Sequence, residues 1–92
     1  MKSIPEGVRP YKRTAQFDEG SVPSGLLREH RTAPGVWGRI CVVEGELRYR
    51  ILEPEIEEHR LVPGLDGVVE PAVGHRVEPV GRVSFYVEFL RR

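Results

Sequence analysis

Cysteine is almost absent from this sequence, which carries Cys41 alone among 92 residues. A single thiol cannot close an internal disulfide, and a chain without disulfides is typical of a reducing, cytoplasmic setting. Long apolar runs are missing too, since no stretch approaches the roughly 20 residues of a membrane-spanning helix. The opening segment MKSIPEGVRPYKRT lacks the apolar core of a secretory signal. We therefore predict a cytoplasmic protein that does not enter a membrane.

An excess of basic charge is also lacking. Lys and Arg together number 14, as do Asp and Glu, so the formal net charge is zero. This balance argues against a general nucleic-acid binder and against a polybasic membrane anchor. The phosphate-binding loop and the GxGxxG, GxSxG, HExxH and CxxC motifs are all absent. We expect no nucleotide cofactor, and no motif in the sequence indicates a familiar hydrolase or a zinc finger.

Glycine and proline, by contrast, are plentiful and scattered. Ten glycines and eight prolines cut the chain into pieces that are mostly too short for a helix. Apolar residues make up 39% and charged residues 30% of the chain, which is typical of a globular protein. At this length the chain has room for one hydrophobic core. We predict one domain over residues 1–92.

Alternating side chains dominate the sequence from Val36 onward. EGELRYRIL and RVSFYVEFL alternate between apolar and polar, as half-buried strands do, whereas VWGRICVV is apolar on both faces, as a strand buried on both sides would be. Glu44-Gly45 supplies a turn or a bulge, and SGLLREHR is read either as one helical turn or as a strand. Strands are predicted near 36–43, 46–52, 59–62, 67–71, 75–79 and 82–90. Many short strands with Gly/Pro turns indicate an all-β barrel or sandwich.

The candidate chemistry lies in three histidines and several carboxylates. His30, His59 and His75 are well separated in the sequence, and two histidines from distant strands with one carboxylate make a common metal site. Each histidine is also compatible with an ordinary surface or core position, and His59 lies in the acidic stretch EPEIEEHR, which is typical of a solvated loop. Glu70 and Glu88 lie in or beside predicted strands, where an inward carboxylate needs a partner.

The turn before His75 suggests which way its side chain points. Pro71 fixes the exit of one strand, and Gly74 permits a tight approach of the backbone. His75 and Val77 share a face of the next strand by the period of two, so an inward Val77 implies an inward His75. We predict that His75 points into the protein and meets His30.

Three segments of the chain resemble a known family. SGLLREHRTAPGVWGRICVVEGELRYRILE, PGLDGVVEPAVGHRVEPVG and FYVEF are similar, in this order, to the TehB/YeaR-like family of small bacterial proteins. That family includes the N-terminal domain of tellurite-resistance TehB proteins, and the resemblance runs from about Pro5 to Phe89. Such proteins are similar to cupins, so the resemblance implies a cupin-like double-stranded β-helix, or jelly-roll, barrel. It also implies a loose link to tellurite or oxyanion resistance.

The second cupin motif can be followed along this sequence. Gly64, Pro71 and His75 occur in the expected order, with the spacing displaced by one residue, and Pro79 stands where an asparagine is expected. The resemblance therefore implies that His75 is a metal ligand.

The first cupin motif is degenerate. Gly45 matches its glycine, Gly38 replaces its glutamate, and His30 alone stands for its pair of histidines. The metal set implied by the resemblance is therefore His30 and His75, completed by Glu88 or Glu70.

Three functions follow as hypotheses. The first is a binding module for a small molecule or oxyanion that holds a divalent Zn, Fe or Ni ion. The second is a metal-dependent enzyme of oxygenase or isomerase type that uses the same pocket, and the third is a metal-free structural or sensory barrel. The sequence names no catalytic residue and leaves open whether the protein is an enzyme. A homodimer is expected because the proline-rich N-terminal arm could cover an edge strand of a neighbour.

Overall fold

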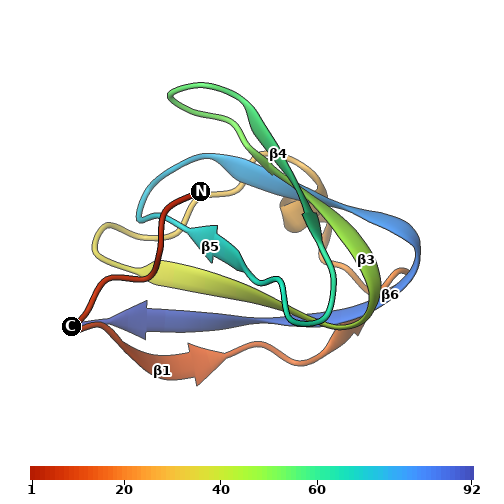
Figure 1. Cartoon of the computed structure of the whole chain (residues 1–92), viewed down its shortest axis with the longest axis horizontal. Coiled ribbons are helices and arrows are strands. Elements are labelled where there is room, and N and C mark those ends of the chain that lie inside the picture. The colour runs from red at the N-terminus through yellow and green to blue at the C-terminus, as the bar shows by residue number, and fades with distance from the viewer.

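The computed structural model describes residues 1–92, and nearly all of its regular structure is antiparallel β-sheet (Figure 1). Its elements are β1 (Arg9–Arg13), β2 (Phe17–Asp18), the 3-10 helix η1 (Ser24–Leu27), β3 (Trp37–Ile51), β4 (Glu57–Leu61), β5 (Gly67–Val69) and β6 (His75–Arg91). No helical segment has the length and apolar character needed to cross a bilayer. The prediction of an all-β chain is confirmed.

The sheet is built around the two long strands β3 and β6. They pair with each other from Trp37↔Leu90 to Ile51↔His75, and Figure 1 shows both strands curving together along the molecule. The strand order is β1-β6-β3-β4, with β2 also on β6 and β5 also on β3. The outer strands β1 and β4 do not pair, so the sheet is not closed. The predicted cupin-like jelly-roll barrel is therefore not confirmed.

Bulges in the middle of the pairing bend this central ribbon. The register between β3 and β6 shifts between Val42 and Glu44 and again between Gly45 and Leu47. Gly45 has a φ of +83°, a backbone conformation that residues with a Cβ rarely adopt. The sequence predicted either a turn or a bulge at Glu44-Gly45, and the structure has a bulge there. An extra residue in one strand bends that strand and increases its local twist.

The bulges also explain why each of the two long strands was predicted as two shorter strands. The segments 36–43 and 46–52 are one strand, β3, and the segments 75–79 and 82–90 are one strand, β6. A glycine between two alternating runs marks a hairpin and a bulge equally well, so the sequence alone did not join them.

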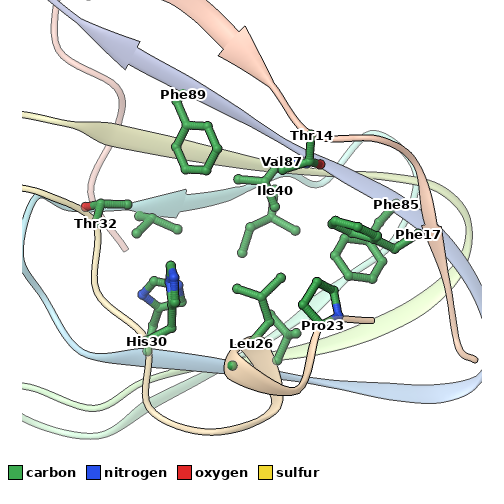
Figure 2. Close-up of a pocket in the computed structure, with 14 residues that line it drawn as sticks. Thr14, Phe17, Pro23, Leu26, His30, Thr32, Ile40, Phe85, Val87 and Phe89 are labelled. Atoms are coloured by element: carbon green, nitrogen blue, oxygen red, sulfur yellow. The ribbon is translucent and has the colours of Figure 1, made fainter. Parts of the chain in front are cut away.

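A cover segment, which we define as residues 19–31, lies across the open side of the sheet. Its start is held by Glu19, whose carboxylate accepts a hydrogen bond from the Val83 N–H at 2.9 Å. Its middle forms η1, so SGLLREHR contains a helical turn and not a strand. Pro23 and Leu26 of this segment point toward the strands (Figure 2). A space is thereby enclosed between the cover segment and the sheet.

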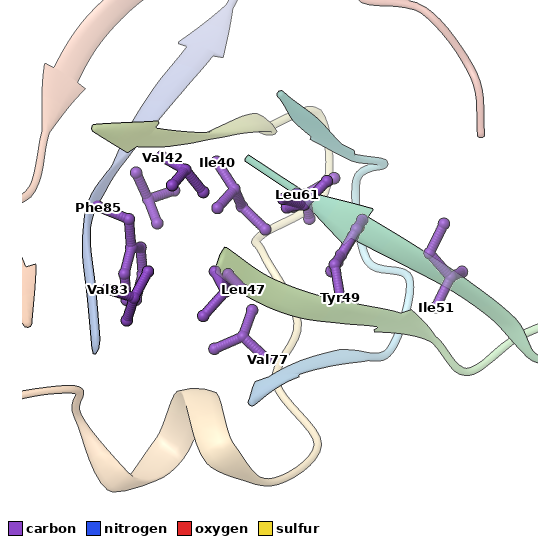
Figure 3. Close-up of a cluster of buried hydrophobic side chains, with 11 residues drawn as sticks. Ile40, Val42, Leu47, Tyr49, Ile51, Leu61, Val77, Val83 and Phe85 are labelled. Carbon is purple, nitrogen blue, oxygen red and sulfur yellow. The ribbon is translucent and has the colours of Figure 1, made fainter. Parts of the chain in front are cut away.

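The bulges divide the β3–β6 pair into two halves, which bend toward each other. The hydrophobic core lies between these two halves. Figure 3 shows side chains from both halves meeting there, and the core consists of Ile40, Val42, Leu47, Tyr49, Ile51, Leu61, Val69, Val77, Val83, Phe85 and Val87. The two alternating segments, EGELRYRIL and RVSFYVEFL, bury their apolar faces as predicted. VWGRICVV does not behave as predicted: its outward residue Val43 is 48% exposed, so this strand is buried on one face only.

Candidate functional site

His30 and His75 are neighbours in the structure. The His30 N–H donates to the His75 carbonyl at 2.8 Å, and the His75 N–H donates to the His30 carbonyl at 3.0 Å. Their ring centroids lie 5.3 Å apart with the planes inclined at 78°. The predicted meeting of these two residues is confirmed, and its physical basis is a short antiparallel bridge between the cover segment and the start of β6.

His75 points inward as the turn chemistry predicted. Pro71 and Ala72 form the turn, in which Ala72 has a φ of +59°. His75 and Val77 are 3% and 2% exposed, so both side chains lie on the inner face. The His75 Nδ1–H donates to the Val73 carbonyl at 3.2 Å. Because a carbonyl oxygen can only accept, this contact places a proton on Nδ1, and Nε2 is then the unprotonated nitrogen when the ring is neutral.

An arginine ties this turn to the cover segment. The Arg31 guanidinium donates to the Glu53 carboxylate, to Glu29 at 2.9 Å and to the Ala72 carbonyl at 2.9 Å. The Gly74 N–H also donates to Glu53, at 2.8 Å. The hydrogen bond from Arg31, followed by that from Gly74, lowers the pKa of Glu53. A Cβ on Gly74 would lie 3.2 Å from the guanidinium, so the glycine leaves room for Arg31 to approach the turn.

The two imidazoles line a cavity of about 220 Å³ between the cover segment and the sheet (Figure 2). Its walls are mainly apolar and carry no charged side chain. The lining residues are Thr14, Phe17, Pro23, Gly25, Leu26, His30, Thr32, Ile40, Val69, His75, Val77, Phe85, Val87 and Phe89. Nδ1 of His30 is buried within the protein, away from the cavity surface, and has no hydrogen-bond partner. Buried polar atoms without partners are rare in proteins, and each calls for an explanation.

Many residues of the cavity wall were not predicted as site residues from the sequence. Phe17 and Leu26 come from the Pro/Gly-punctuated start of the chain, which has no periodic pattern. The available signal was the presence of isolated apolar residues in a segment otherwise rich in turn formers, because such residues need a surface to cover.

The two predicted glutamates do not join the histidines. The Glu88 carboxylate accepts a hydrogen bond from Arg39 at 2.7 Å, across the β3–β6 pair. Glu70 pairs with Lys2 at 3.2 Å. No group of three or more His, Cys, Asp or Glu side chains is placed to hold a metal ion. The structure thus brings together two of the four predicted residues.

His59 lies away from the cavity. Its Nε2 is 3.1 Å from a carboxylate oxygen of Glu57, and its side chain is 28% exposed. His59 lies within β4, in agreement with the strand predicted near 59–62, whereas the solvated loop predicted to include it is not found at this position. It provides a matched control for experiments on His30 and His75.

We expect acid to weaken the fold through His75 as the pH falls below about 6.5. Its ring faces His30, Tyr49 and the Arg31 guanidinium, and burial is the main cause that lowers its pKa below 6.5. The unfolded chain then binds a proton where the folded chain does not. Stability therefore falls as the pH falls, by up to about 1.4 kcal/mol per pH unit. Urea unfolding at several pH values measures this slope.

The control for this titration is a second histidine variant. His75→Gln should remove the slope from this pH interval, and His59→Gln should retain it. Glu53 adds stability that is lost only at lower pH, since its pKa is depressed, so the two effects separate. A wild-type slope that survives in His75→Gln would contradict the buried neutral ring.

Comparison with known proteins finds relatives that are much longer than this chain. A probable S-adenosyl-L-methionine-dependent methyltransferase TehB from Haemophilus influenzae (strain Rd) is 32% identical over 72 residues, which are 74% of this chain and 25% of the relative. The protein of the same name from strain 10810 is 29% identical over the same lengths. The chain therefore spans about a quarter of the length of these curated relatives.

Solved structures agree with the fold. The crystal structure of TehB from Haemophilus influenzae superposes with a TM-score of 0.86 and 26% identity, over 95% of this chain and 32% of that one. A protein from E. coli (strain K12) superposes with a TM-score of 0.87 and 22% identity, over 98% of this chain and 96% of that one. At that identity the second likeness concerns the fold alone. The same fold thus occurs within a longer chain and in one of similar length.

These relatives overturn the functional prediction. They are named as methyltransferases that use S-adenosyl-L-methionine, a nucleoside-derived methyl donor. The prediction of a cupin-like module holding Zn, Fe or Ni is wrong, and the expectation of no nucleotide cofactor is contradicted by these relatives, which are named for a nucleoside-derived one. Neither the metal-dependent oxygenase or isomerase nor the metal-free structural or sensory barrel is favoured. The physical reason for the error is the place of the glutamates, which bind Lys2 and Arg39 and leave the histidines without a third ligand.

The resemblance to the TehB family, by contrast, is confirmed, although the cupin likeness attached to it is not supported. The sequence model of the TehB-like domain matches residues 12–87, from within β1 to within β6. This match includes the cover segment, the turn before His75, all of β3 and most of β6. The chain belongs to the TehB-like domain family.

Proposed function

We propose that this domain binds the methyl acceptor in S-adenosyl-L-methionine-dependent methyl transfer. Two observations support the proposal: the curated relatives are named for that reaction, and a mainly apolar cavity of about 220 Å³ lies beside His30 and His75. The cavity is the observation that carries it, because an enclosed apolar space with a few directed polar groups is the usual form of a small-molecule site. Residues 1–92 would capture the acceptor, and the transfer itself would belong to a methyltransferase domain.

The methyl donor does not fit this chain. Proteins that bind dinucleotides and related cofactors use a Gly-rich turn between a strand and a helix, with an acidic side chain on the ribose. This sheet is antiparallel with a single four-residue 3-10 helix, and the cavity has no acidic side chain. Its volume of about 220 Å³ is also below the usual range of roughly 300–1,000 Å³ for such ligands. We derive no role for residues 1–92 in holding the donor.

Several predictions from the sequence form part of this proposal. His30 and His75 are its site residues, its partner is a small molecule, and its setting is the cytoplasm. An oxyanion is disfavoured because no cationic side chain lines the cavity. The single domain and the homodimer remain predictions.

The experiment is a screen of small methyl acceptors against the purified chain. Thiols, phenols and nitrogen heterocycles are tested by thermal shift, together with S-adenosyl-L-methionine. We expect one class of acceptor to raise the melting temperature by several degrees, since roughly 4–8 °C accompany each kcal/mol in a domain of this size. The binders are then offered as substrates to the full-length Haemophilus influenzae relative, which should methylate the same compounds.

A cavity-filling variant controls for binding elsewhere on the surface. Leu26 points into the cavity from η1, so Leu26→Trp should fill the space and abolish the thermal shift (Figure 2). His59→Ala alters a position outside the cavity and should leave the shift unchanged. If S-adenosyl-L-methionine stabilises the wild-type chain, or if Leu26→Trp binds the acceptors as well as the wild type does, the proposal is wrong.

A further inference from the structure

An open groove adjoins the cavity. Its volume is about 210 Å³, close to the 220 Å³ of the cavity itself. His30, Thr32 and Phe89 line both spaces, so these three side chains form the boundary between the cavity and the groove. The groove is completed by Tyr11, Lys12, Ala33 and Val36.

The walls of this groove are held in place by contacts within the protein. The Thr32 hydroxyl donates to the Val36 carbonyl at 2.7 Å, and the Val36 N–H donates to the Ala33 carbonyl at 3.0 Å. On the other wall, the Arg91 guanidinium stacks over the Tyr11 ring, 3.9 Å from its centroid. The groove is therefore formed before any ligand arrives, as ligand sites usually are.

Phe89 stands at the boundary between the two spaces. It comes from β6, points into the cavity in Figure 2 and also lines the groove. Its side chain is only partly buried where it packs against the core. A side chain in such a position can rotate or be shortened at a smaller cost than a fully buried one. Phe89 is therefore the residue that sets how far a ligand can extend from the cavity into the groove.

The volumes indicate the length of the ligand. A dry cavity of roughly 150 Å³ holds benzene, so the cavity of about 220 Å³ holds one ring with a short substituent. This volume is below the roughly 300–1,000 Å³ of most ligand sites, whereas the cavity and the groove together fall within that range. A longer molecule would have to continue past Phe89 into the groove.

We propose that the cavity and the groove form one ligand site with Phe89 at its junction, and that its ligand is a neutral molecule longer than a single ring. The inference rests on the proposed function and gives the size class of its methyl acceptor. The part inside the cavity is apolar and uncharged because no charged side chain lines that space. The other end lies beside Tyr11 and Lys12, where polar groups keep their contact with water. No acidic side chain lines the groove, so the methyl donor still finds no partner for its ribose.

The test uses three phenols of increasing length on the full chain. Dissociation constants for phenol, 4-ethylphenol and 4-butylphenol are measured by NMR titration at about pH 7, where all three are neutral because phenols titrate near pH 10. We expect 4-butylphenol to bind the wild type at least about tenfold more tightly than phenol, since each buried methylene strengthens binding up to about fourfold. The amide resonances of Ala33 and Val36 should move on addition of 4-butylphenol and stay in place with phenol.

Two variants examine the groove and its boundary separately. Ala33 is exposed and lines the groove but not the cavity, so Ala33→Trp should fill the groove alone. In this variant the constants of phenol and 4-ethylphenol should be unchanged, and that of 4-butylphenol should rise about tenfold. Phe89→Ala opens the boundary and should increase the preference for 4-butylphenol over phenol. Leu65→Trp is the control, because Leu65 is 57% exposed and lines neither space, and it should keep the wild-type constants.

The outcomes separate this inference from the proposed function. If 4-butylphenol binds the wild type no more tightly than phenol, or binds Ala33→Trp as tightly as the wild type, the two spaces are not one site and the inference is wrong. Phenol binding to Ala33→Trp verifies that this variant is folded. If none of the phenols binds the wild type, the acceptor cavity and the inference are both contradicted. If all bind as expected but the full-length Haemophilus influenzae relative methylates none of them, the two-part site stands and the proposed function is wrong.

Discussion

Gly45→Ala is expected to lower the free energy of unfolding by at least about 3 kcal/mol, near the upper end of single-site effects. A Cβ at this position would lie 2.0 Å from the Arg82 carbonyl oxygen and 2.9 Å from the Val83 Cα. Both atoms are backbone atoms of the partner strand β6, so the clash cannot be relieved by rotating a side chain. The φ of +83° adds strain of its own. Equilibrium unfolding in urea measures the loss.

Gly81 provides a matched control on the partner strand. It also has a positive φ, of +68°, but a Cβ at this position would have no other atom within 4 Å. Gly81→Ala should therefore cost only the conformational strain, about 1–2 kcal/mol. Equal losses in the two variants would show that the close approach at the Gly45 bulge does not stabilise the bend.

Phe85→Ala is expected to cost about 3–5 kcal/mol, because Phe85 is completely buried where the two halves of the ribbon meet (Figure 3). Its removal leaves a void beside Val42 and Val83 that the bent strands cannot easily fill. A loss of this size is a large fraction of the stability of a small domain. Urea unfolding at neutral pH gives the value, and the variant should show a lower midpoint.

Phe17 offers the comparison for this substitution. Its ring meets that of Phe85 edge-on, with centroids 5.6 Å apart, but Phe17 is only partly buried. Phe17→Ala should cost about 1–2 kcal/mol, as expected for a side chain that keeps some contact with water. A Phe17→Ala loss equal to that of Phe85→Ala would contradict the position of the core.

The alternating segments were the predictable part of the fold. Leu47, Tyr49 and Ile51 face inward as their period of two requires, and so do Val83 and Phe85. How these segments combine was not predictable, because bulges and hairpins use the same glycine signals. The edge strand β1 has no alternation in its sequence, because all five of its residues are exposed.

The direction of His75 was predictable because it depends on local chemistry, whereas its pairing with the distant His30 was implied by the family resemblance. The turn before His75 and the shared face with Val77 fixed the direction of one ring, and the structure adds the backbone bridge to His30. The role of Arg31 was hidden, because its partner Glu53 is 22 residues away and lies in a loop. Sequence spacing carries no information on such a contact.

The metal prediction failed for a reason of charge pairing. Glu70 and Glu88 lie beside or within strands, and from the sequence each could have pointed inward. In the structure each has a cationic partner, Lys2 or Arg39, outside the cavity. A carboxylate that is already paired needs no metal ion, and the uncharged cavity that results favours neutral ligands.

The central claim is that the cavity beside His30 and His75 holds a neutral ligand. A crystal structure of the chain with the phenol or thiol that most raises its melting temperature tests it most directly. We predict that the compound lies in the cavity between η1 and β6, beside His30 and His75. A compound found only on the outer surface, with the cavity empty, would contradict the claim.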